Sequence, residues 1–249
     1  MRFKGKSVLV TGAAGGIGLA AARRFAQEGA KLLLCDVNGE LLEQVTAELV
    51  VDGGEAVSFV ADLSDESQCE AMVARSVEIF GGLDIAFNNA GIPTDISIPF
   101  SEFSGDDWRK VIGVNLNSYF YCMKAEARAM KTGGAIINTA SVASLVAAPN
   151  MAAYVASKHG LAGLTKAAAL DLIKQKIRVN AVCPGFVRTP MMAPALSMEG
   201  AEEQLGAAAP IGRIAEPEEI ADIVLFLASE EASYMVGALV SADGGVTIQ

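Results

Sequence analysis

Histidine is almost absent from this chain of 249 residues, which contains only one, His159. A metal centre built on several imidazole ligands is therefore excluded. Cysteine is also scarce, and its four positions, Cys35, Cys69, Cys122 and Cys183, include no CxxC pair. We interpret them as buried thiols in a reducing compartment, not as a disulfide framework or a metal site. We therefore expect a cytoplasmic protein that needs no metal.

Basic residues are outnumbered, with 19 Lys and Arg against 29 Asp and Glu, so the formal net charge is −10. This balance argues against nucleic acid or an anionic membrane surface as a partner. Long apolar runs are missing too, because none reaches the roughly 18 residues that a membrane-spanning helix needs. The hydrophobic content of 52% is nevertheless ample for a core.

Short aliphatic runs alternate with segments of helical periodicity along the whole chain. The predicted strands are residues 7–12, 31–36, 56–62, 83–91, 134–141, 177–185 and 238–244. The predicted helices are residues 16–29, 40–51, 66–80, 106–130, 152–174 and 217–228. This alternation predicts an α/β fold in a single domain over residues 1–249. The architecture that it favours is a Rossmann-type, doubly wound parallel sheet of about seven strands with helices on both faces.

The least regular segment is residues 186–212, which contains three prolines and three methionines. Its position between the sixth predicted strand and the last long helix suits a mobile substrate lid. An ordinary surface connection is the alternative interpretation.

The sequence TGAAGGIG, residues 11–18, follows the first predicted strand and opens the first predicted helix. Gly12, Gly16 and Gly18 would let the backbone turn tightly and approach a pyrophosphate at the helix N-terminus. The spacing is GxxxGxG rather than GxGxxG, but the strand before it and the helix after it supply the required context. We predict a dinucleotide-binding turn, with a purely structural turn as the alternative.

Asp36 ends the second predicted strand, close to the interval of roughly 20 residues expected for an acidic group that binds the adenosine ribose. A carboxylate there accepts hydrogen bonds from ribose hydroxyls and repels a 2′-phosphate. No basic residue occurs in residues 12–18, and Val37 follows the aspartate. The predicted cofactor is therefore NAD rather than NADP, and a helix-capping role for Asp36 is the alternative.

In the sequence YVASKHG, Tyr154 precedes Lys158 by four residues. On a helix this spacing places both side chains on one face. A nearby ammonium favours the phenolate, so we expect Lys158 to lower the pKa of Tyr154. A tyrosine tuned in this way can act as an acid or base near neutral pH. His159 is one step of about 100° further round the helix and should face elsewhere, in a structural role.

Seven motifs occur in order along the chain: TGAAGGIG, Asp62 after the third strand, NNAG at 88–91, Asn115, Ser141, YVASK and PG at 184–185. Together they resemble the short-chain dehydrogenase/reductase family over essentially the whole chain. Single motifs of this kind are weak signals, whereas seven in register are highly specific.

The resemblance implies a role for each motif residue. Tyr154 would be the general acid/base, and Lys158 would assist it and hold the nicotinamide ribose. Ser141 would orient the substrate oxygen, and Asn115 would help to hold a water that relays protons. The implied cofactor contacts are Gly12, Gly15, Gly16, Ile17, Gly18, Asp36, Asp62, Leu63, Asn89, Ala90, Gly91, Tyr154, Lys158, Pro184, Gly185, Val187 and Thr189.

The resemblance also implies a homotetramer. The predicted helices 106–130 and 152–174 carry many alanines, which suits a close-packed helical interface. Packing of these alanines against the sheet is the alternative.

The residues expected to border the substrate are mostly apolar: Ile92, Pro93, Thr94, Ala143, Leu145, Met151, Phe186, Met191 and Met192. We therefore expect a small-molecule substrate, an uncharged and fairly hydrophobic ketone or secondary alcohol, cyclic ones included. Ser144 has two open interpretations, as a substrate contact or as a loop hydroxyl bonded to its own backbone.

These features predict an NAD(H)-dependent alcohol dehydrogenase/ketone reductase. A 3-ketoacyl thioester reductase resembles it, but its usual NADP preference and basic docking surface fit Asp36 and the acidic composition poorly. An enoyl reductase of the same superfamily normally spaces its tyrosine and lysine more widely. A non-catalytic NAD-binding sensor would be favoured by loss of Ser141, Tyr154 or Lys158, and none of the three is lost.

Overall fold

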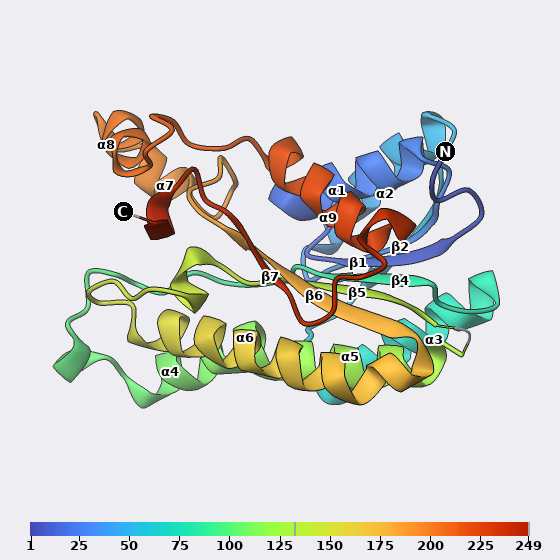
Figure 1. The fold of residues 1–249 in the computed structure, drawn as a ribbon. Helices are drawn as coiled ribbons and strands as arrows, with labels where there is room; N and C mark the ends of the chain where they lie inside the picture. Colours follow the sequence, from blue (N-terminus) through green and yellow to red (C-terminus); the bar gives the residue numbers. More distant parts are fainter. Residues whose placement is uncertain (132, 249) are drawn as a thin grey trace.

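Seven parallel strands form one sheet in the order β3-β2-β1-β4-β5-β6-β7 (Figure 1). The structure is a computed structural model and describes residues 1–131 and 133–248. The strands are β1 (Ser7–Thr11), β2 (Lys31–Asp36), β3 (Glu55–Val60), β4 (Ile85–Asn88), β5 (Gly134–Thr139), β6 (Ile177–Pro184) and β7 (Leu239–Ala242). All seven predicted strands are present, and every neighbouring pair is parallel.

The central strands are buried on both faces, which explains their nearly continuous apolar sequences. In β1, Val8, Leu9 and Val10 are all fully buried. Since successive side chains of a strand point to opposite faces, Val8 and Val10 join one core cluster and Leu9 joins the other.

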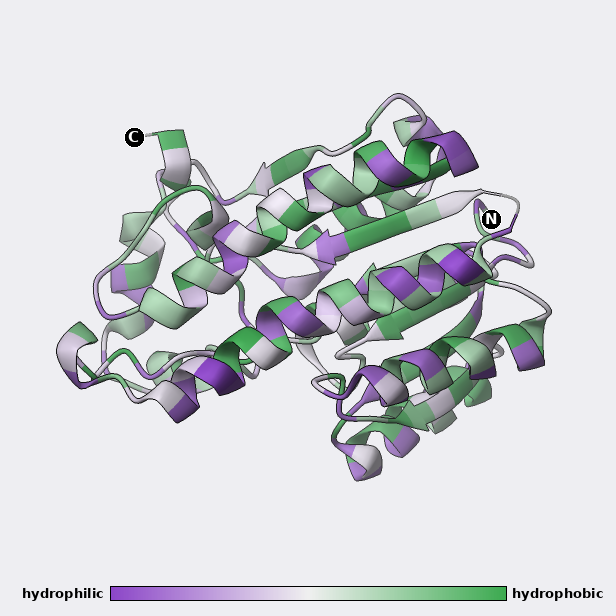
Figure 2. Ribbon diagram, turned by 90° about the horizontal axis from the view of Figure 1, so that it is seen from below, coloured by the Kyte–Doolittle hydropathy of each residue, from purple (hydrophilic) through white to green (hydrophobic). Residues whose placement is uncertain are grey.

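Helices cover both faces of the sheet, as predicted. α1, α2 and α9 pack on one face, and α3, α5 and α6 pack on the other. Figure 2 shows hydrophobic strands between helices whose colours alternate, as expected for helices that bury one side only. The helices are α1 (Gly16–Gln27), α2 (Gly39–Val51), α3 (Glu66–Phe80), α4 (Gly105–Ile112), α5 (Ser118–Ala129), α6 (Ala152–Leu172), α7 (Ala193–Leu196), α8 (Ala201–Ala208) and α9 (Pro217–Ala228).

Residues 106–130, predicted to be helical, form α4 and α5 with a wider helical turn between them. α4 ends at Ile112, and the segment Gly113–Asn117 forms a π-helical turn before α5 begins. The backbone N–H of Ser118 donates to the carbonyl of Gly113, five residues earlier. Such wide turns inside helices are frequent at functional sites, and the apolar periodicity of the sequence does not reveal them.

Residues 186–212 contain two short helices, α7 and α8, near the edge of the sheet at which β6 ends (Figure 1). Arg188 donates to Glu202 of α8 through Nη1 (2.9 Å) and Nη2 (2.6 Å), and its Nε donates to Glu216 before α9 (3.0 Å). This arginine therefore ties α8 to the body of the protein.

β1 and β4 are the neighbouring strands between which the strand order reverses. The chain moves outward from β1 to β3 on one side and from β4 to β7 on the other. In open α/β sheets a ligand crevice lies outside the carboxyl ends of the strands at this point. Gly12 follows β1 there, and Asn89 follows β4.

Candidate active site

The turn after β1 is built for close approach of backbone segments. Gly12 has a φ of +63°, and a Cβ on it would lie 2.9 Å from Asn89 Nδ2 and 3.0 Å from Ala90 Cα. A Cβ on Gly18 would collide with the carbonyl oxygen of Gly12. Gly15 precedes α1 without a side-chain cap. The helix N-terminus therefore offers the backbone donors and positive dipole end that bind a phosphate.

Asp36 lies beside this turn at the end of β2. Its Oδ2 accepts from Ala14 N (3.1 Å) and its Oδ1 accepts from Asn38 N (3.0 Å). Both bonds orient the carboxylate, and the residue lines the same cavity as Gly12. The neighbouring Val37 is 71% exposed and uncharged.

Asn89 joins the ends of three strands. Its N–H donates to Thr11 Oγ1 (2.8 Å), and its Nδ2 donates to the carbonyls of Thr11 (3.2 Å) and Gly12 (3.3 Å). Its Oδ1 accepts from Thr139 Oγ1 (3.1 Å). Thr11 and Thr139, which were not among the predicted site residues, therefore fix the position of the NNAG motif.

A cavity of about 310 Å³ occupies the crevice between these strand ends. Its lining contains most of the predicted site residues, whereas Gly18, Asp62, Leu63 and Asn115 are outside it. The lining residues are Gly12, Gly15, Gly16, Ile17, Asp36, Asn89, Ala90, Gly91, Thr139, Ala140, Ser141, Tyr154, Lys158, Pro184, Gly185, Val187, Thr189, Pro190, Met191 and Met192.

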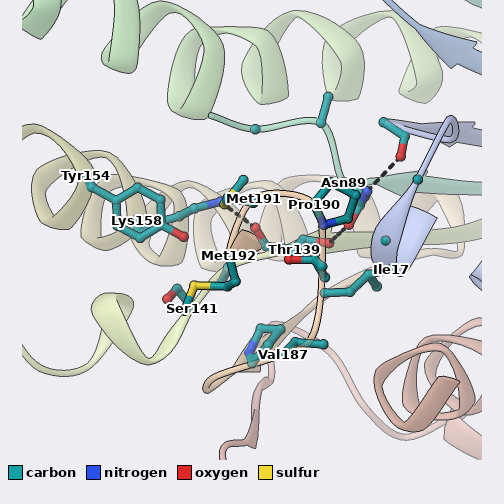
Figure 3. A pocket seen from close by; sticks show the side chains of 18 of the residues that line it. Ile17, Asn89, Thr139, Ser141, Tyr154, Lys158, Val187, Pro190, Met191 and Met192 are labelled. Atoms are coloured by element: carbon teal, nitrogen blue, oxygen red, sulfur yellow. Dashed lines mark hydrogen bonds between the residues drawn. The ribbon is translucent and has the colours of Figure 1, made fainter. Parts of the chain in front are cut away.

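Ser141, Tyr154 and Lys158 meet at one part of this cavity (Figure 3). Ser141 Oγ accepts from Ala143 N (3.1 Å), which orients its side chain at the cavity. Lys158 Nζ lies 5.7 Å from the centre of the Tyr154 ring and donates to the carbonyl oxygen of Thr139 (2.8 Å). The predicted proximity of Tyr154 and Lys158 on one helix is thus confirmed, and the site adds an acceptor for the lysine.

Burial dominates the acid–base properties of this group of residues. It raises the pKa of Tyr154, and the nearby side chain of Ser141 opposes that rise only in part. Burial also lowers the pKa of Lys158 to about 8. The prediction of a lowered pKa for Tyr154 is therefore wrong for the protein residues by themselves, because the net direction is upward. The physical reason is that desolvation of the phenolate outweighs the effect of an amine directed at the carbonyl of Thr139.

Asn115 lies one layer behind the cavity, in the π-helical turn, and is fully buried. Its Oδ1 accepts from Ile92 N (2.8 Å), and its Nδ2 donates to Ile92 O (2.9 Å). A Cβ on Gly91 would lie 3.3 Å from Asn115 Oδ1 and 3.9 Å from Lys158 Nζ. Asn115 therefore holds the segment after β4 next to Lys158.

Asp62 and Leu63 follow β3. Asp62 is exposed, and its Oδ1 accepts from Ser64 N (2.9 Å) and Ser64 Oγ (2.7 Å). Leu63 is only 7% exposed and belongs to the core cluster on the α3 side. Their contact with adenine remains a prediction.

The comparisons with known proteins give the family. The family model described as enoyl-(acyl carrier protein) reductase, of the short-chain alcohol dehydrogenase type, matches residues 12–247. The chain belongs to the short-chain dehydrogenase/reductase family. Its relatives in this family include the cyclohexanol dehydrogenase of Acinetobacter sp. (strain SE19), which is 42% identical over 248 residues and covers 99% of this chain and 96% of that protein.

Two further members of the short-chain dehydrogenase/reductase family are similar over their whole length. The 3-oxoacyl-(acyl-carrier-protein) reductase of Thermotoga maritima is 39% identical over 250 residues, with 100% of each chain covered. The crystal structure of levodione reductase matches with a TM-score of 0.93 and 38% identity over 99% of each chain. Family membership and the site geometry make this chain an oxidoreductase of secondary alcohols and ketones that uses a nicotinamide cofactor.

The apolar residues predicted to border the substrate of this short-chain dehydrogenase/reductase do not share one cavity. Met191 and Met192 line the cavity that holds Tyr154. Met151 lines a separate hollow of about 270 Å³, and Phe186 lines another of about 350 Å³. The prediction of one pocket bordered by all of them is therefore wrong, because Met151 lies on another loop and Phe186, although in the same segment as Met191 and Met192, faces a different hollow.

His159 and Ser144 are two residues of this family member that take no part in the proton transfer. His159 is exposed, and its Nδ1 lies 3.1 Å from the carbonyl of Val155, which fits a structural role. Ser144 is buried, and its hydroxyl has no hydrogen-bond partner among the described residues. The interpretation of Ser144 as a hydroxyl bonded to its own backbone is therefore wrong.

The four cysteines of this family member are buried free thiols, as predicted. Within residues 1–131 and 133–248, no group of three or more acidic, cysteine or histidine side chains is placed to hold a metal ion. In the same part of the chain, no helix has the length and apolar character needed to cross a membrane.

Proposed function

We propose that this chain is an NAD(H)-dependent alcohol dehydrogenase and ketone reductase in which Tyr154 is the general acid/base. The observation that carries the proposal is that Ser141, Tyr154 and Lys158 line one cavity together with the glycine turn and Asp36. The cavity therefore combines the parts of a dinucleotide site with an acid–base group.

The residues present fit a dinucleotide. We assign the pyrophosphate to the turn that starts at Gly12, where a Cβ would fill the space, and the adenosine ribose to Asp36. Adenine is assigned to Asp62 and Leu63. The remaining contacts assigned to this cofactor are Gly15, Gly16, Ile17, Gly18, Asn89, Ala90, Gly91, Pro184, Gly185, Val187, Thr189 and, at the nicotinamide ribose, Tyr154 and Lys158.

The chain's own chemical task is to move one proton. When bound, NAD accepts the hydride and brings a second positive charge near the phenol. Tyr154 takes the proton of the alcohol during oxidation and returns it during reduction, while Ser141 holds the substrate oxygen. Burial raises the pKa of Tyr154, so the phenolate needs positive charge nearby, and Lys158 supplies it. Asn115 is assigned to help hold the water that relays this proton to solvent.

The preference for NAD over NADP rests on Asp36. Its carboxylate is fixed by Ala14 N and Asn38 N, so it cannot turn away from a 2′-phosphate without losing both bonds. Of the residues that line the cavity, Lys158 is the one basic side chain, and it is directed at Thr139. No cation in that lining is placed for a 2′-phosphate beside Asp36.

The substrate is proposed to be an uncharged, apolar and preferably cyclic secondary alcohol or ketone. Met191 and Met192 form the apolar side of the cavity next to Tyr154 (Figure 3), and thioether side chains adapt to varied shapes. Cyclohexanol dehydrogenase, 42% identical, is named for a substrate of this class. The segment 186–212, in which Arg188 forms an ion pair with Glu202, is the proposed lid over this part of the site.

The second candidate is reduction of a 3-ketoacyl thioester. It is favoured by the 39% identity to the Thermotoga maritima 3-oxoacyl-(acyl-carrier-protein) reductase. The net charge of −10 opposes it, because an acidic carrier protein would be repelled. A substrate panel that contains both a ketoacyl thioester and cyclic ketones separates the two.

We further propose a homotetramer of cytoplasmic subunits. A groove of about 550 Å³ lies between α5 and α6 and is lined by Leu116, Asn117, Phe120, Tyr121, Gly160, Gly163, Leu164 and Ala167. Phe120 is 49% exposed, and Leu170, further along α6, is 73% exposed. An apolar face of this kind suits a second copy of the chain.

The decisive experiment is nicotinamide reduction with NAD and NADP against cyclic alcohols, linear alcohols, sugars and a hydroxyacyl thioester. Tyr154→Phe should lower turnover by a factor of roughly 10²–10⁴, as expected for loss of a general acid/base, and should leave NAD binding within about threefold. The fully exposed Tyr234, replaced by Phe, is the control. Full turnover by Tyr154→Phe would refute the mechanism, and tight NAD binding without any turnover by the wild type would favour a sensor.

A further inference from the structure

Tyr119 lies beside Lys158, outside the lining of the cavity, and has no role in the mechanism described so far. It belongs to the first turn of α5 and is 2% exposed. Its hydroxyl donates to the carbonyl oxygen of Thr139 (3.3 Å), which is the same oxygen that accepts from Lys158 Nζ (2.8 Å). Two side chains from different helices therefore share one acceptor at the end of β5.

The ring of Tyr119 also faces the ammonium of Lys158. Lys158 Nζ lies 5.3 Å from the centre of the Tyr119 ring and 5.7 Å from the centre of the Tyr154 ring. Both distances are within the range of about 6 Å in which a cation is attracted by an aromatic face. In a buried site this attraction is strong, because little water competes for the charge.

We propose that Tyr119 is a positioning residue for Lys158, which it holds at the carbonyl of Thr139 and stabilises in the charged form. The proposal rests on the proposed function only through the role of Lys158 beside Tyr154. A lysine side chain has four rotatable bonds, and one hydrogen bond does not fix its ammonium. The Tyr119 ring closes the side of the ammonium that faces α5, so that the charge stays near Tyr154.

The other titratable groups around this pair do not take over the role. Cys183 of β6 faces Lys158, and burial raises the pKa of its thiol to about 11, so it is uncharged near neutral pH. Cys122 faces Tyr119 from the same helix, and its pKa is also raised, by its hydrogen bond with Cys69 and by burial. Burial raises the pKa of Tyr119, so that its hydroxyl remains a donor. Besides the carbonyl of Thr139, the favourable partners of the Lys158 ammonium are therefore the rings of Tyr119 and Tyr154.

The test compares Tyr119→Leu, which removes ring and hydroxyl, with Tyr119→Phe, which keeps the ring. For alcohol oxidation, Lys158 must be charged and close for Tyr154 to lose its proton. In Tyr119→Leu the rising limb of the kcat profile should move to higher pH by about one unit. In Tyr119→Phe it should move by less than half as much. The KM for NAD should stay within about threefold in both.

Two measurements separate positioning from a general loss of stability. Phe25→Leu removes a fully buried ring from the opposite face of the sheet and should leave the pH profile in place. The pH dependence of reductive methylation of Lys158, followed by mass spectrometry, reports the lysine without any turnover. Tyr119→Leu should make Lys158 reactive at a pH about one unit lower, because the neutral amine is then favoured.

Three results would overturn the proposal: an unmoved kcat profile and methylation midpoint in Tyr119→Leu, an equal shift in Phe25→Leu, or the full shift in Tyr119→Phe. If Tyr119→Leu does not fold, Tyr119→Met takes its place with the same expectations. If the wild-type protein turns over no substrate, the proposed function fails, and the methylation midpoints still decide whether Tyr119 holds the lysine.

Discussion

Asn88 Nδ2 donates to Oε2 of the Glu126 carboxyl group across 3.1 Å in the core between β4 and α5. Glu126 is fully buried, its second oxygen has no partner among the described residues, and burial raises its pKa to about 8. The folded protein therefore holds a proton on Glu126 over a pH range in which the unfolded chain, with an ordinary glutamate pKa near 4.5, has lost it.

This pKa predicts the pH dependence of stability. Between about pH 4.5 and 8 the folded state binds more protons than the unfolded state, so the contribution of Glu126 to stability falls as the pH rises through this window. Glu126→Gln keeps the shape of the side chain and removes the titratable group.

Relative to wild type, the free energy of unfolding of Glu126→Gln should increase by about 2 kcal/mol or more from pH 5 to pH 8. Urea denaturation at the two pH values measures this difference. The exposed Glu43, replaced by Gln, is the control, and a difference that does not change with pH contradicts the prediction.

Asp36 is predicted to set the choice of cofactor. Asp36→Ala removes the oriented carboxylate, so kcat/KM with NAD should fall by about tenfold to a hundredfold, the value of hydrogen bonds to a charged group. The kcat/KM with NADP should rise at the same time, because the repulsion of a 2′-phosphate is lost. Steady-state kinetics with both cofactors measures the ratio. Asp222→Asn, on the exposed side of α9, should leave the ratio unchanged. A wild-type protein that prefers NADP would contradict this assignment.

Gly18 is predicted to tolerate no side chain, although it does not line the cavity. In Gly18→Ala the Cβ would meet the carbonyl oxygen of Gly12 and lie 2.8 Å from Asn89 Nδ2, so the turn must shift. We expect at least tenfold weaker NAD binding and a loss of stability of about 1–3 kcal/mol. Calorimetric titration with NAD and thermal unfolding measure these effects. Gly82→Ala, where a Cβ meets nothing within 4 Å, is the matched control.

The groove between α5 and α6 is predicted to bind a second copy of the chain. Gly163 lines it, and a Cβ there meets nothing within 4 Å in the single chain. Gly163→Glu should therefore not destabilise the subunit, and it improves helix propensity, but it places a charge in the interface. Light scattering should show a smaller assembly than wild type. Val51→Glu, on α2 at an 85% exposed position, should assemble like wild type. An unchanged mass in Gly163→Glu would place any interface elsewhere.

The local pattern of the sequence determines much of this protein. The central strands are buried on both faces and must be apolar throughout, so they are visible as continuous runs. α3 lies at its predicted bounds, residues 66–80. The glycine spacing after β1 and the interval between Tyr154 and Lys158 are likewise visible, because each depends on the geometry of a single turn or helix. These features place one cavity correctly.

The tertiary structure decides what surrounds those residues. The acceptor of Lys158 is a backbone carbonyl, and the ring beside it comes from Tyr119, 39 positions away. The rise in the pKa of Tyr154 is due to burial, which is a property of the packed site and not of the Tyr-x-x-x-Lys spacing. The π-helical turn at Asn115 and the separation of the apolar residues into different hollows also depend on contacts between distant segments. Local periodicity carries no information about such contacts. Every residue has the same backbone carbonyl, and the burial of a side chain depends on segments that are distant in the sequence.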